Sequence, residues 1–276
     1  MLTRETVISG ALLPDQIALY YLGQVGFLIR FRGKTMLIDG YLTDYVDRNF
    51  ATETVPWKRR YPAPIAPQAL DFVDYVLCTH THADHTDPDT IAGILSVNGH
   101  ARFIGNPTVA RRYAALGVPE NRIIALADDE CVPLCDSIAV KNVPAAHEEL
   151  HPDENGFCRE SGFVLRLGDV TLYHAGDCCP YDGLEARIAD TDILILPVNG
   201  RDYYRRYEMD IIGNFDCREA VTIARRANAD LLIPVHIDLY DINALSAAVF
   251  VDTVDTYNPE QKYHIFRPGE CYIYAK

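Results

Sequence analysis

The amino-acid sequence predicts one layered α/β domain, in which strands come first and strands mixed with helices follow. Two observations lead to this fold class. Short apolar runs are separated by turn residues in the first part of the chain, and helix-start patterns alternate with apolar runs afterwards. No low-complexity segment, heptad pattern or linker divides the chain, so residues 1–276 are expected to form a single domain. Hydrophobic residues make up 49% of the chain, which is enough to fill a sizeable core.

Strands are predicted where apolar and aromatic residues run between turn signals. In the first part of the chain these runs are residues 17–22, 26–31, 35–39 and 74–79. The glycines at positions 23 and 26 indicate a bulge or a close backbone approach between the first two strands. Residues 41–70 differ, because four prolines lie between Pro56 and Pro67, so we expect an irregular excursion and a candidate lid there.

Helices are predicted where a capping side chain precedes a proline or stands three residues before a glutamate. Counted from the capping residue, these patterns predict helices at residues 87–96, 106–117 and 216–227, and a last helix is expected near residues 244–254. The remaining apolar runs predict strands at residues 122–126, 137–143, 162–167, 170–174, 192–198 and 231–235, with closing strands around 263–266 and 271–274.

Composition narrows the classes of function. The chain has 25 basic and 39 acidic residues, a net charge of −14, which argues against polynucleotide substrates because these are bound by basic surfaces. The eight cysteines form no C-x-x-C unit, which favours reduced thiols. No apolar run is long enough to cross a bilayer, and Met1 to Gly10 lacks the pattern of a signal peptide. We therefore expect a cytoplasmic protein with no nucleic-acid or membrane partner, while a homo-oligomer stays open.

The strongest signal is the run His80–Thr81–His82–Ala83–Asp84–His85. On an extended segment alternate side chains share a side, so His80 and His82 can reach one metal ion together. Asp84 and His85 follow where the chain must turn before Pro88, and they can be directed at a second ion. The alternative is a polar surface loop, but four potential ligands in six residues, between a buried strand and a helix start, favour a metal centre.

This H-x-H-x-D-H run after an apolar strand resembles the signature of the metallo-β-lactamase superfamily. Residues 21–27, 37–39, 173–177 and 234–236 further resemble the L-ascorbate-6-phosphate lactonase-like branch, and they come in the order of that branch. The resemblance implies a four-layer αββα sandwich, the metallo-β-lactamase fold, with a site for two metal ions at one edge of its sheets. It also implies a metal-dependent, lactonase-like hydrolase.

The resemblance supplies the remaining metal ligands. His147 resembles the third ligand of the first metal, and His151, four residues on, is its competitor. Asp177 resembles the carboxylate that bridges both ions, and His236 resembles the last ligand of the second. The predicted ligand set is His80, His82, Asp84, His85, His147, Asp177 and His236. Taken alone, Asp177 would be a common turn aspartate and His236 a packed side chain after a buried strand.

Two further side chains are expected to support the ligands. His174 precedes Asp177 by three residues and is expected to form hydrogen bonds behind the site rather than bind metal. Asp39 ends a predicted strand, and it either orients a ligand in the same way or is a turn residue before Gly40.

The ligand set predicts the chemistry of the site. Two divalent ions about 3.5–4 Å apart share a water, lower its pKa and so supply hydroxide at neutral pH. The expected reaction is attack of this hydroxide on a small ester or lactone, with Asp84 or Asp177 as the catalytic proton acceptor. The imidazole-rich set suits Zn and also Mn or Fe, and the lactonase-like branch is associated with Mn.

The substrate is expected to be a small anionic molecule, for example a sugar-acid lactone phosphate. A cationic residue should then face the metals across the pocket. Arg201 follows a strand end and is the first candidate, with Asn199 and Tyr203 of the same loop as further substrate-binding residues. The alternative is that these side chains are solvated or pack on the outside.

Other functions are possible on the same scaffold. Phosphodiester hydrolysis, on RNA, a cyclic nucleotide or a phospholipid, would use the same metals, and RNA would require a basic surface that the net charge of −14 disfavours. An oxygen-reducing di-iron protein would typically carry a carboxylate where this chain has His82, and would pair with a flavin domain. A binding module without catalysis would be expected to lack some of the seven ligands.

Overall fold

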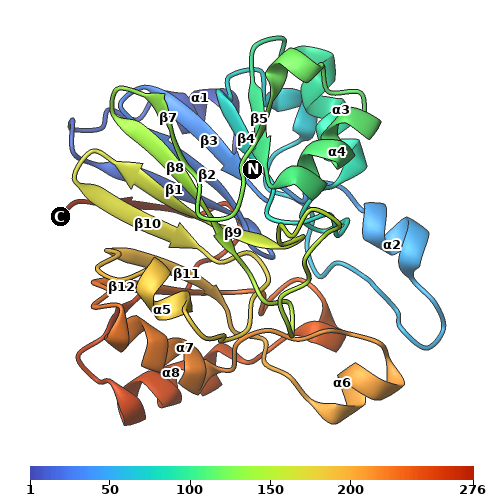
Figure 1. The fold of residues 1–276 in the computed structure, drawn as a ribbon, viewed down its shortest axis with the longest axis vertical. Coiled ribbons are helices and arrows are strands. Elements are labelled where there is room, and N and C mark those ends of the chain that lie inside the picture. Colours follow the sequence, from blue (N-terminus) through green and yellow to red (C-terminus); the bar gives the residue numbers. More distant parts are fainter.

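Two mixed sheets of seven strands each lie face to face at the centre of the molecule, in a computed structural model that describes residues 1–276 (Figure 1). The strands of the first sheet are β1 (Ile17–Gly23), β2 (Gly26–Phe31), β3 (Lys34–Ile38), β4 (Tyr75–Leu77), β5 (Arg102–Gly105), β6 (Ile123–Ala125) and β14 (Cys271–Tyr274). Those of the second sheet are β7 (Cys131–Cys135), β8 (Ile138–Pro144), β9 (Ser161–Leu167), β10 (Val170–His174), β11 (Ile193–Pro197), β12 (Leu231–Val235) and β13 (Lys262–Tyr263). Their orders are β14-β1-β2-β3-β4-β5-β6 and β13-β12-β11-β10-β9-β8-β7.

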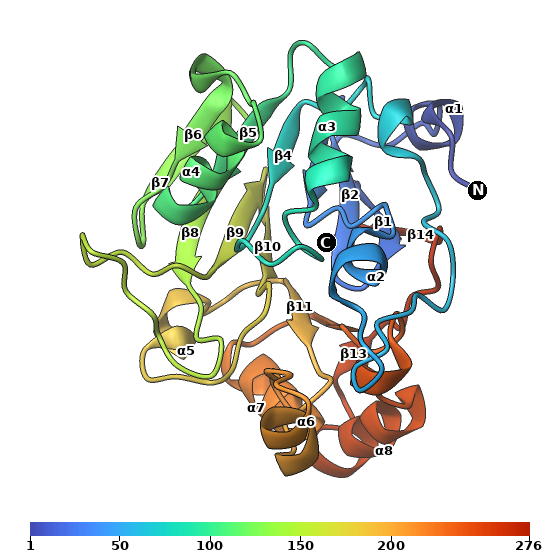
Figure 2. The ribbon, with the colours of Figure 1, turned by 90° about the vertical axis from the view of Figure 1, so that its right-hand side faces the viewer.

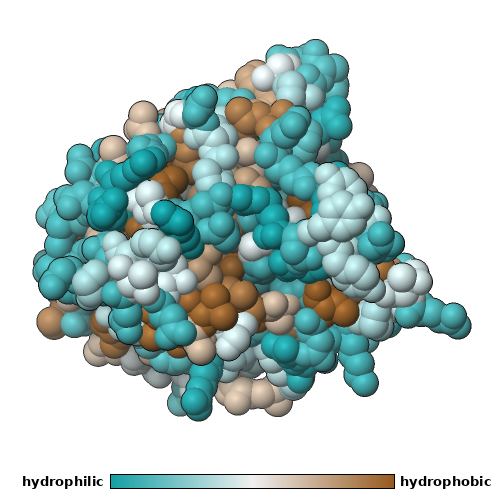
Figure 3. Space-filling view, turned by 90° about the horizontal axis from the view of Figure 1, so that it is seen from below, coloured by the Kyte–Doolittle hydropathy of each residue, from teal (hydrophilic) through white to brown (hydrophobic).

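Helices cover the outer face of each sheet. The longer ones are α3 (Pro88–Val97) and α4 (Pro107–Ala115) on the first sheet, and α7 (Cys217–Arg226) and α8 (Ala247–Tyr257) on the second. The short ones are α1 (Arg4–Ile8), α2 (Tyr45–Phe50), α5 (Leu184–Arg187) and α6 (Tyr203–Glu208), with 3-10 turns at Pro67–Ala69, Glu120–Arg122 and Asp241–Asn243. No helix combines the length and the apolar character that a bilayer crossing requires. Seen from below, the surface is mostly hydrophilic, with apolar side chains in small patches (Figure 3).

The two halves repeat one pairing plan. Strands β1 to β3 pair antiparallel and β3 to β6 pair parallel, while β7 to β10 pair antiparallel and β10 to β13 pair parallel. Parallel neighbours need long crossover connections, and these contain α3, α4, α7 and α8. The predicted αββα sandwich with two similar halves is therefore confirmed.

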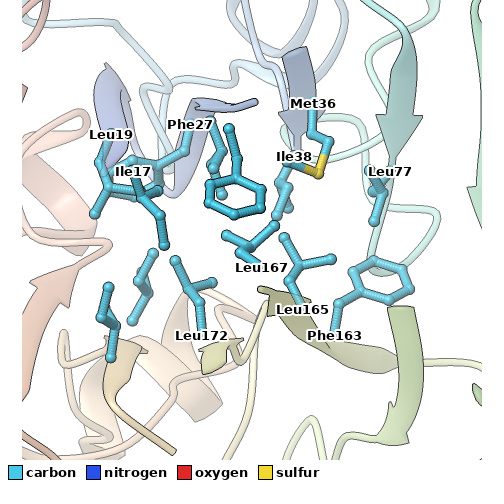
Figure 4. Close-up of a cluster of buried hydrophobic side chains, with 14 of the residues drawn as sticks. Ile17, Leu19, Phe27, Met36, Ile38, Leu77, Phe163, Leu165, Leu167 and Leu172 are labelled. Carbon is cyan, nitrogen blue, oxygen red and sulfur yellow. The ribbon is translucent and has the colours of Figure 1, made fainter. Parts of the chain in front are cut away.

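The core consists of apolar layers that follow the alternation of the strands. Ile17 and Leu19 of β1 point between the sheets, whereas Ala18 and Tyr20 belong to the apolar layer on the outer face of the first sheet. Figure 4 shows the central layer. It joins Ile17, Leu19, Phe27, Met36, Ile38 and Leu77 of the first sheet to Phe163, Leu165, Leu167 and Leu172 of the second. Because β1 is buried on both faces, its run of consecutive apolar residues is expected physically.

The predicted long elements are present with ends shifted by a few residues, but several short ones were not predicted. Strand β5 has only two large apolar residues, which is too few for a periodic pattern. Strand β7 contains Pro133, which an edge strand tolerates because its outer side needs no ladder hydrogen bonds. The prediction that residues 41–70 are irregular is wrong for α2 and for the 3-10 turn Pro67–Ala69.

Candidate metal centre

The loop after β4 folds back on itself and brings its histidine rings together. The amides of His85 and Thr86 donate to the His82 carbonyl oxygen at 3.0 and 2.8 Å, and the Thr86 hydroxyl donates to the His80 carbonyl oxygen at 2.5 Å. The centre of the His80 ring consequently lies 4.6 Å from that of His82 and 4.0 Å from that of His85. Hydrogen bonds within residues 80–86 therefore hold three imidazoles close together.

Three residues of the second sheet meet this loop, and each follows the carboxyl end of a strand. His147 comes after β8, Asp177 after β10 and His236 after β12. Oxygens of the Asp177 carboxylate lie 3.4 Å from Nε2 of His85, 3.4 Å from Nε2 of His236 and 3.9 Å from Nε2 of His147. Figure 2 looks onto the side of the molecule where α2 lies between α3 above and α6 and α8 below.

The seven predicted ligands form three overlapping groups that could each hold a metal ion. These groups are His80, His82 and His147; His80, His85 and Asp177; and Asp84, His85 and His236. Within each group, one ligand atom per residue lies within 4.8 Å of the others. The structure therefore brings together every side chain of the predicted set.

Unpaired buried atoms indicate that these residues fit a cation. Nε2 of His80, Nε2 of His85 and Oδ1 of Asp177 are buried and have no hydrogen-bond partner. Buried polar atoms in proteins almost always have partners, and leaving them without one is unfavourable. Imidazole nitrogens and carboxylate oxygens are common ligands of divalent transition metals, so an ion would satisfy these lone pairs.

Several ligands have the protonation state that metal binding requires. Burial lowers the pKa of His147 to about 4, and burial with the neighbouring His85 holds the pKa of His80 well below its usual range. Both imidazoles are therefore neutral at pH 7, which is the form that binds metal. Burial opposes the charge of Asp177, but His236 and His85 hold the pKa of this carboxyl well below its usual range, so it is ionised.

Asp39 holds His85 from behind. Its carboxylate accepts hydrogen bonds from the Thr79 amide at 2.8 Å and the Thr79 hydroxyl at 2.7 Å, and lies 2.9 Å from Nδ1 of His85. When Nδ1–H of His85 donates to this carboxylate, the Nε2 lone pair is free for a cation. These contacts fit the orienting role, rather than the simple turn role, considered for Asp39.

His174 supports the turn that carries Asp177. Its Nε2 lies 2.7 Å from the Val25 carbonyl oxygen, to which it donates, and its Nδ1 accepts from the Gly176 amide at 3.2 Å. Since both ring nitrogens are engaged, His174 lies behind the cluster and is not among the groups that could bind an ion.

Gly176 fixes the position of Asp177 and has no room for a side chain. Its φ is +62°, and a Cβ there would lie 2.6 Å from Cβ of Thr79 and 2.8 Å from the Ser161 carbonyl oxygen. We expect Gly176→Ala to lower the free energy of unfolding of the metal-free protein by about 2–4 kcal/mol, from left-handed strain plus overpacking. Gly156→Ala is the matched control, because φ of Gly156 is +87° but no atom lies within 4 Å of the position of a Cβ. Backbone strain alone should therefore lower the free energy of unfolding of this variant by about 1–2 kcal/mol. Urea unfolding measures both, and equal losses would contradict the packing argument.

Gln24 is a site residue to which the sequence pattern assigned no role. Its side-chain amide lies 2.9 Å from Oδ2 of Asp84 and 3.1 Å from Nε2 of His236. The backbone carbonyl oxygen of Gln24 accepts hydrogen bonds from the His236 backbone amide at 2.7 Å and from the Tyr21 hydroxyl at 3.0 Å. Two signals in the sequence pointed to this segment: the glycines at positions 23 and 26, which indicated a close backbone approach, and the resemblance of residues 21–27 to the lactonase-like branch.

Five of the seven candidate ligands line a cleft with a volume of about 480 Å³: His82, Asp84, His147, Asp177 and His236. One wall contains Val46, Phe50 and Trp57 of the segment 41–70, and another contains Ile211 and Ile212. Apolar side chains of α2, of the loop after it and of the segment between α6 and α7 therefore line the same cleft as these ligands.

The three predicted substrate-binding residues do not line this cleft. Arg201 lines a separate polar depression and donates to the Asn214 carbonyl oxygen at 2.7 Å and the Glu219 carboxylate at 2.5 Å. Asn199 is buried, and its side chain donates to that of Asn243 at 2.8 Å. Tyr203 is 72% exposed. The expectation that Arg201 faces the metals is therefore corrected, because the neighbouring Glu219 takes up its charge.

Two other basic side chains, His151 and Arg112, differ from what the sequence indicated for them or left open. His151, the competitor of His147, lies outside the candidate groups and pairs with Glu160 at 3.3 Å. Arg112, which was not singled out from the sequence, lines the cleft. Its neighbour Arg111 is equally basic, so the sequence offered no sign of which of the two faces the cleft.

Comparison with known proteins adds to this geometry. The family described as "Beta-lactamase superfamily domain" matches residues 35–237. A "UPF0173 metal-dependent hydrolase" of Caldivirga maquilingensis is 24% identical over 262 residues, which cover 91% of this chain and 96% of the relative. One of Hyperthermus butylicus is 26% identical over 265 residues, which cover 91% and 97%.

Solved structures have the same fold. A possible metal-dependent hydrolase from Veillonella parvula superposes with a TM-score of 0.74 at 17% identity, over 92% of this chain and 98% of that chain. The isothiocyanate hydrolase from Delia radicum gut bacteria superposes with a TM-score of 0.73 at 18% identity, over 94% of this chain and 100% of that chain. The family match covers the larger part of the chain, including every candidate ligand. On this evidence the chain belongs to the metallo-β-lactamase superfamily.

Proposed function

We propose that the protein is a metal-dependent hydrolase that holds two divalent ions and cleaves a small ester or lactone in the cleft above them. The observation that carries the proposal is the position of Asp177, whose oxygens lie 3.4 to 3.9 Å from His85, His147 and His236, so that this carboxylate is close to histidines of all three ligand groups. A central carboxylate between two sets of imidazoles is suited to bridging two ions. The curated relatives named above, which are described as metal-dependent hydrolases, support the same class.

Divalent ions held by these residues would lower the pKa of a coordinated water and polarise the carbonyl oxygen of the substrate. The two carboxylates then have different tasks. The Asp84 side chain is 21% exposed towards the cleft and that of Asp177 only 6%, so Asp84 is better placed to accept and return a proton at Oδ2. The Gln24 amide, 2.9 Å from Oδ2 of Asp84, keeps that carboxylate in position.

The metal and the ester class follow from separate arguments. Five imidazoles with two carboxylates suit Zn, and also Mn or Fe. Cyclic esters are proposed because residues 21–27 and 173–177 resemble the lactonase-like branch. The apolar walls of the cleft favour a lactone or ester with an apolar part over a purely polar sugar-acid phosphate.

Residues 41–70 are proposed to shape this cleft as a wall. The Arg59 amide donates to the Asp47 carboxylate at 2.8 Å, and the Tyr240 hydroxyl donates to that of Tyr41 at 2.9 Å. The Trp57 ring also packs edge-on against Tyr240, with ring centres 5.0 Å apart. The excursion is thus anchored to the second half of the chain, which favours a fixed boundary over a freely moving lid.

Metal removal and a substrate panel test the proposal. Protein stripped with a chelator is reloaded with Zn, Mn or Fe and assayed on lactones, aryl esters and phosphodiesters. We expect two ions per chain by plasma mass spectrometry and ester or lactone hydrolysis only in the loaded protein. Full activity of the stripped protein would contradict metal dependence. Preference for phosphodiesters, or oxygen consumption by the Fe form, would replace the proposed reaction by one of its alternatives.

A further inference from the structure

Arg112 is the only arginine or lysine that lines the metal cleft. It lies in the last turn of α4, and its Nε is buried without a hydrogen-bond partner. The one carboxylate of the lining outside the candidate metal ligands, that of Asp210, pairs with Arg206 at 3.1 Å and leaves Arg112 without a counter-charge. A cation near a helix C-terminus is favourable, but this does not account for an unpaired, buried guanidinium nitrogen.

The neighbouring arginine on the same helix shows the contrast. Arg111 donates to the Asp153 carboxylate at 3.0 Å and the Thr108 hydroxyl at 3.1 Å, and lies 3.9 Å from the Glu154 carboxylate. Successive residues of a helix point about 100° apart, so Arg111 meets the acidic loop while Arg112 turns to the cleft. Arg112 thus lines the cleft without an acidic partner, and its Nε is buried without a hydrogen bond, whereas Arg111 on the same helix is paired.

We infer that Arg112 binds an anionic group of the substrate. This inference rests on the proposed hydrolase function and specifies its substrate class. A planar guanidinium pairs with a carboxylate or phosphate through two parallel hydrogen bonds. Phe50 and Trp57 on one wall and Ile212 on another offer apolar surface to the rest of the molecule. The substrate is therefore an amphipathic ester or lactone that carries an oxyanion at a distance from the bond that is cleaved.

Matched aryl esters test the kinetic consequence. Mono-4-nitrophenyl glutarate and 4-nitrophenyl pentanoate share a leaving group and a chain length, but only the first has a terminal carboxylate. The wild-type protein is expected to prefer the glutarate in kcat/KM by about tenfold or more, because a hydrogen bond to a charged group is involved. Arg112→Met should remove this preference and retain hydrolysis of the pentanoate, whereas Arg111→Met should keep the preference.

A binding measurement keeps this inference separate from the hydrolase proposal. Calorimetry on metal-loaded protein compares succinate, glutarate and adipate with butyrate, pentanoate and hexanoate, since one carboxylate of each diacid remains for Arg112 when the other binds metal. 3-Phosphonopropionate serves as the phosphate-like arm. At least one two-headed anion should bind about tenfold more tightly than its monocarboxylate, in the wild type and in Arg111→Met but not in Arg112→Met.

Each outcome decides between the two proposals. If no diacid is favoured, or if Arg112→Met keeps the preference with an unchanged melting temperature and metal content, the role of Arg112 is refuted. If the binding preference depends on Arg112 but no ester or lactone is hydrolysed, the hydrolase proposal fails and the anion site stands. Arg112→Lys should retain part of the preference, because it keeps the charge but loses the paired geometry.

Discussion

Asp177→Ala is expected to lower kcat/KM by more than about a hundredfold, because loss of a hydrogen-bond partner behind a metal ligand alone costs about 10–100-fold. Asp177 is a buried residue whose carboxylate approaches His85 and His236 at 3.4 Å, so its removal withdraws an anion that lies against histidines of neighbouring ligand groups. Metal content should fall with activity. The fold should persist, since the Asp177 side chain contributes to none of the apolar core layers.

The control for Asp177→Ala is Asp182→Ala, because Asp182 is an exposed aspartate in the same loop region. Metal per chain by plasma mass spectrometry, ester hydrolysis and far-UV circular dichroism are measured for both variants. Asp182→Ala should match the wild type in all three. An Asp177→Ala protein that retained two ions and full activity would exclude Asp177 as a shared ligand.

Asp39→Asn is expected to weaken metal binding by about 10–100-fold with little change in the fold. The native carboxylate accepts hydrogen bonds from Nδ1–H of His85 and from the amide and hydroxyl of Thr79. An asparagine keeps the size of the side chain, but its NH₂ group can face Nδ1 of His85. That arrangement favours the tautomer with the proton on Nε2, which then blocks the lone pair aimed at the metal site.

Competition with a chromophoric chelator measures the metal affinity of Asp39→Asn. Asp87→Asn is the matched control, because Asp87 is a buried aspartate close to the same loop whose carboxylate bonds to Thr43, Thr90 and the Asp89 amide instead of a candidate ligand. It should bind metal like the wild type, since asparagine also caps helices well. Equal affinities of Asp39→Asn and wild type would show that His85 needs no support from Asp39.

The parts of the fold that were predictable from the sequence are those set by local patterns. The β1 and β12 strands are consecutive apolar runs between turn signals, and α7 begins with a capping box, so each could be placed without tertiary information. The loop at residues 80–85 was equally visible, because four ligand types stand together at a strand end. Short elements such as β5 and α2 depend on packing against neighbouring elements, and no local sequence pattern predicts them.

The parts of the site that escaped prediction depend on contacts across long stretches of sequence. Gln24 and His236 meet although 212 positions separate them. Arg201 follows a strand end, as catalytic residues often do, but the capping glutamate of α7, Glu219, takes up its charge. Arg112 and Arg111 differ only in the direction in which the helix turns them. Such pairings are decided by how whole elements pack, which residue spacing does not reveal.

Each candidate ligand group combines side chains from both halves of the chain, and this affects how metal binding is coupled to folding. Each group takes two side chains from the loop after β4 and one from the second sheet, so a chain whose sheets have not yet docked has no complete coordination set. A cation held by these groups would link the two halves of the chain. By mass action, each tenfold rise in free cation concentration above its dissociation constant would raise the free energy of unfolding by about 1.4 kcal/mol. Loss of the metal would remove this contribution and leave the apolar layer between the sheets to hold the two halves together.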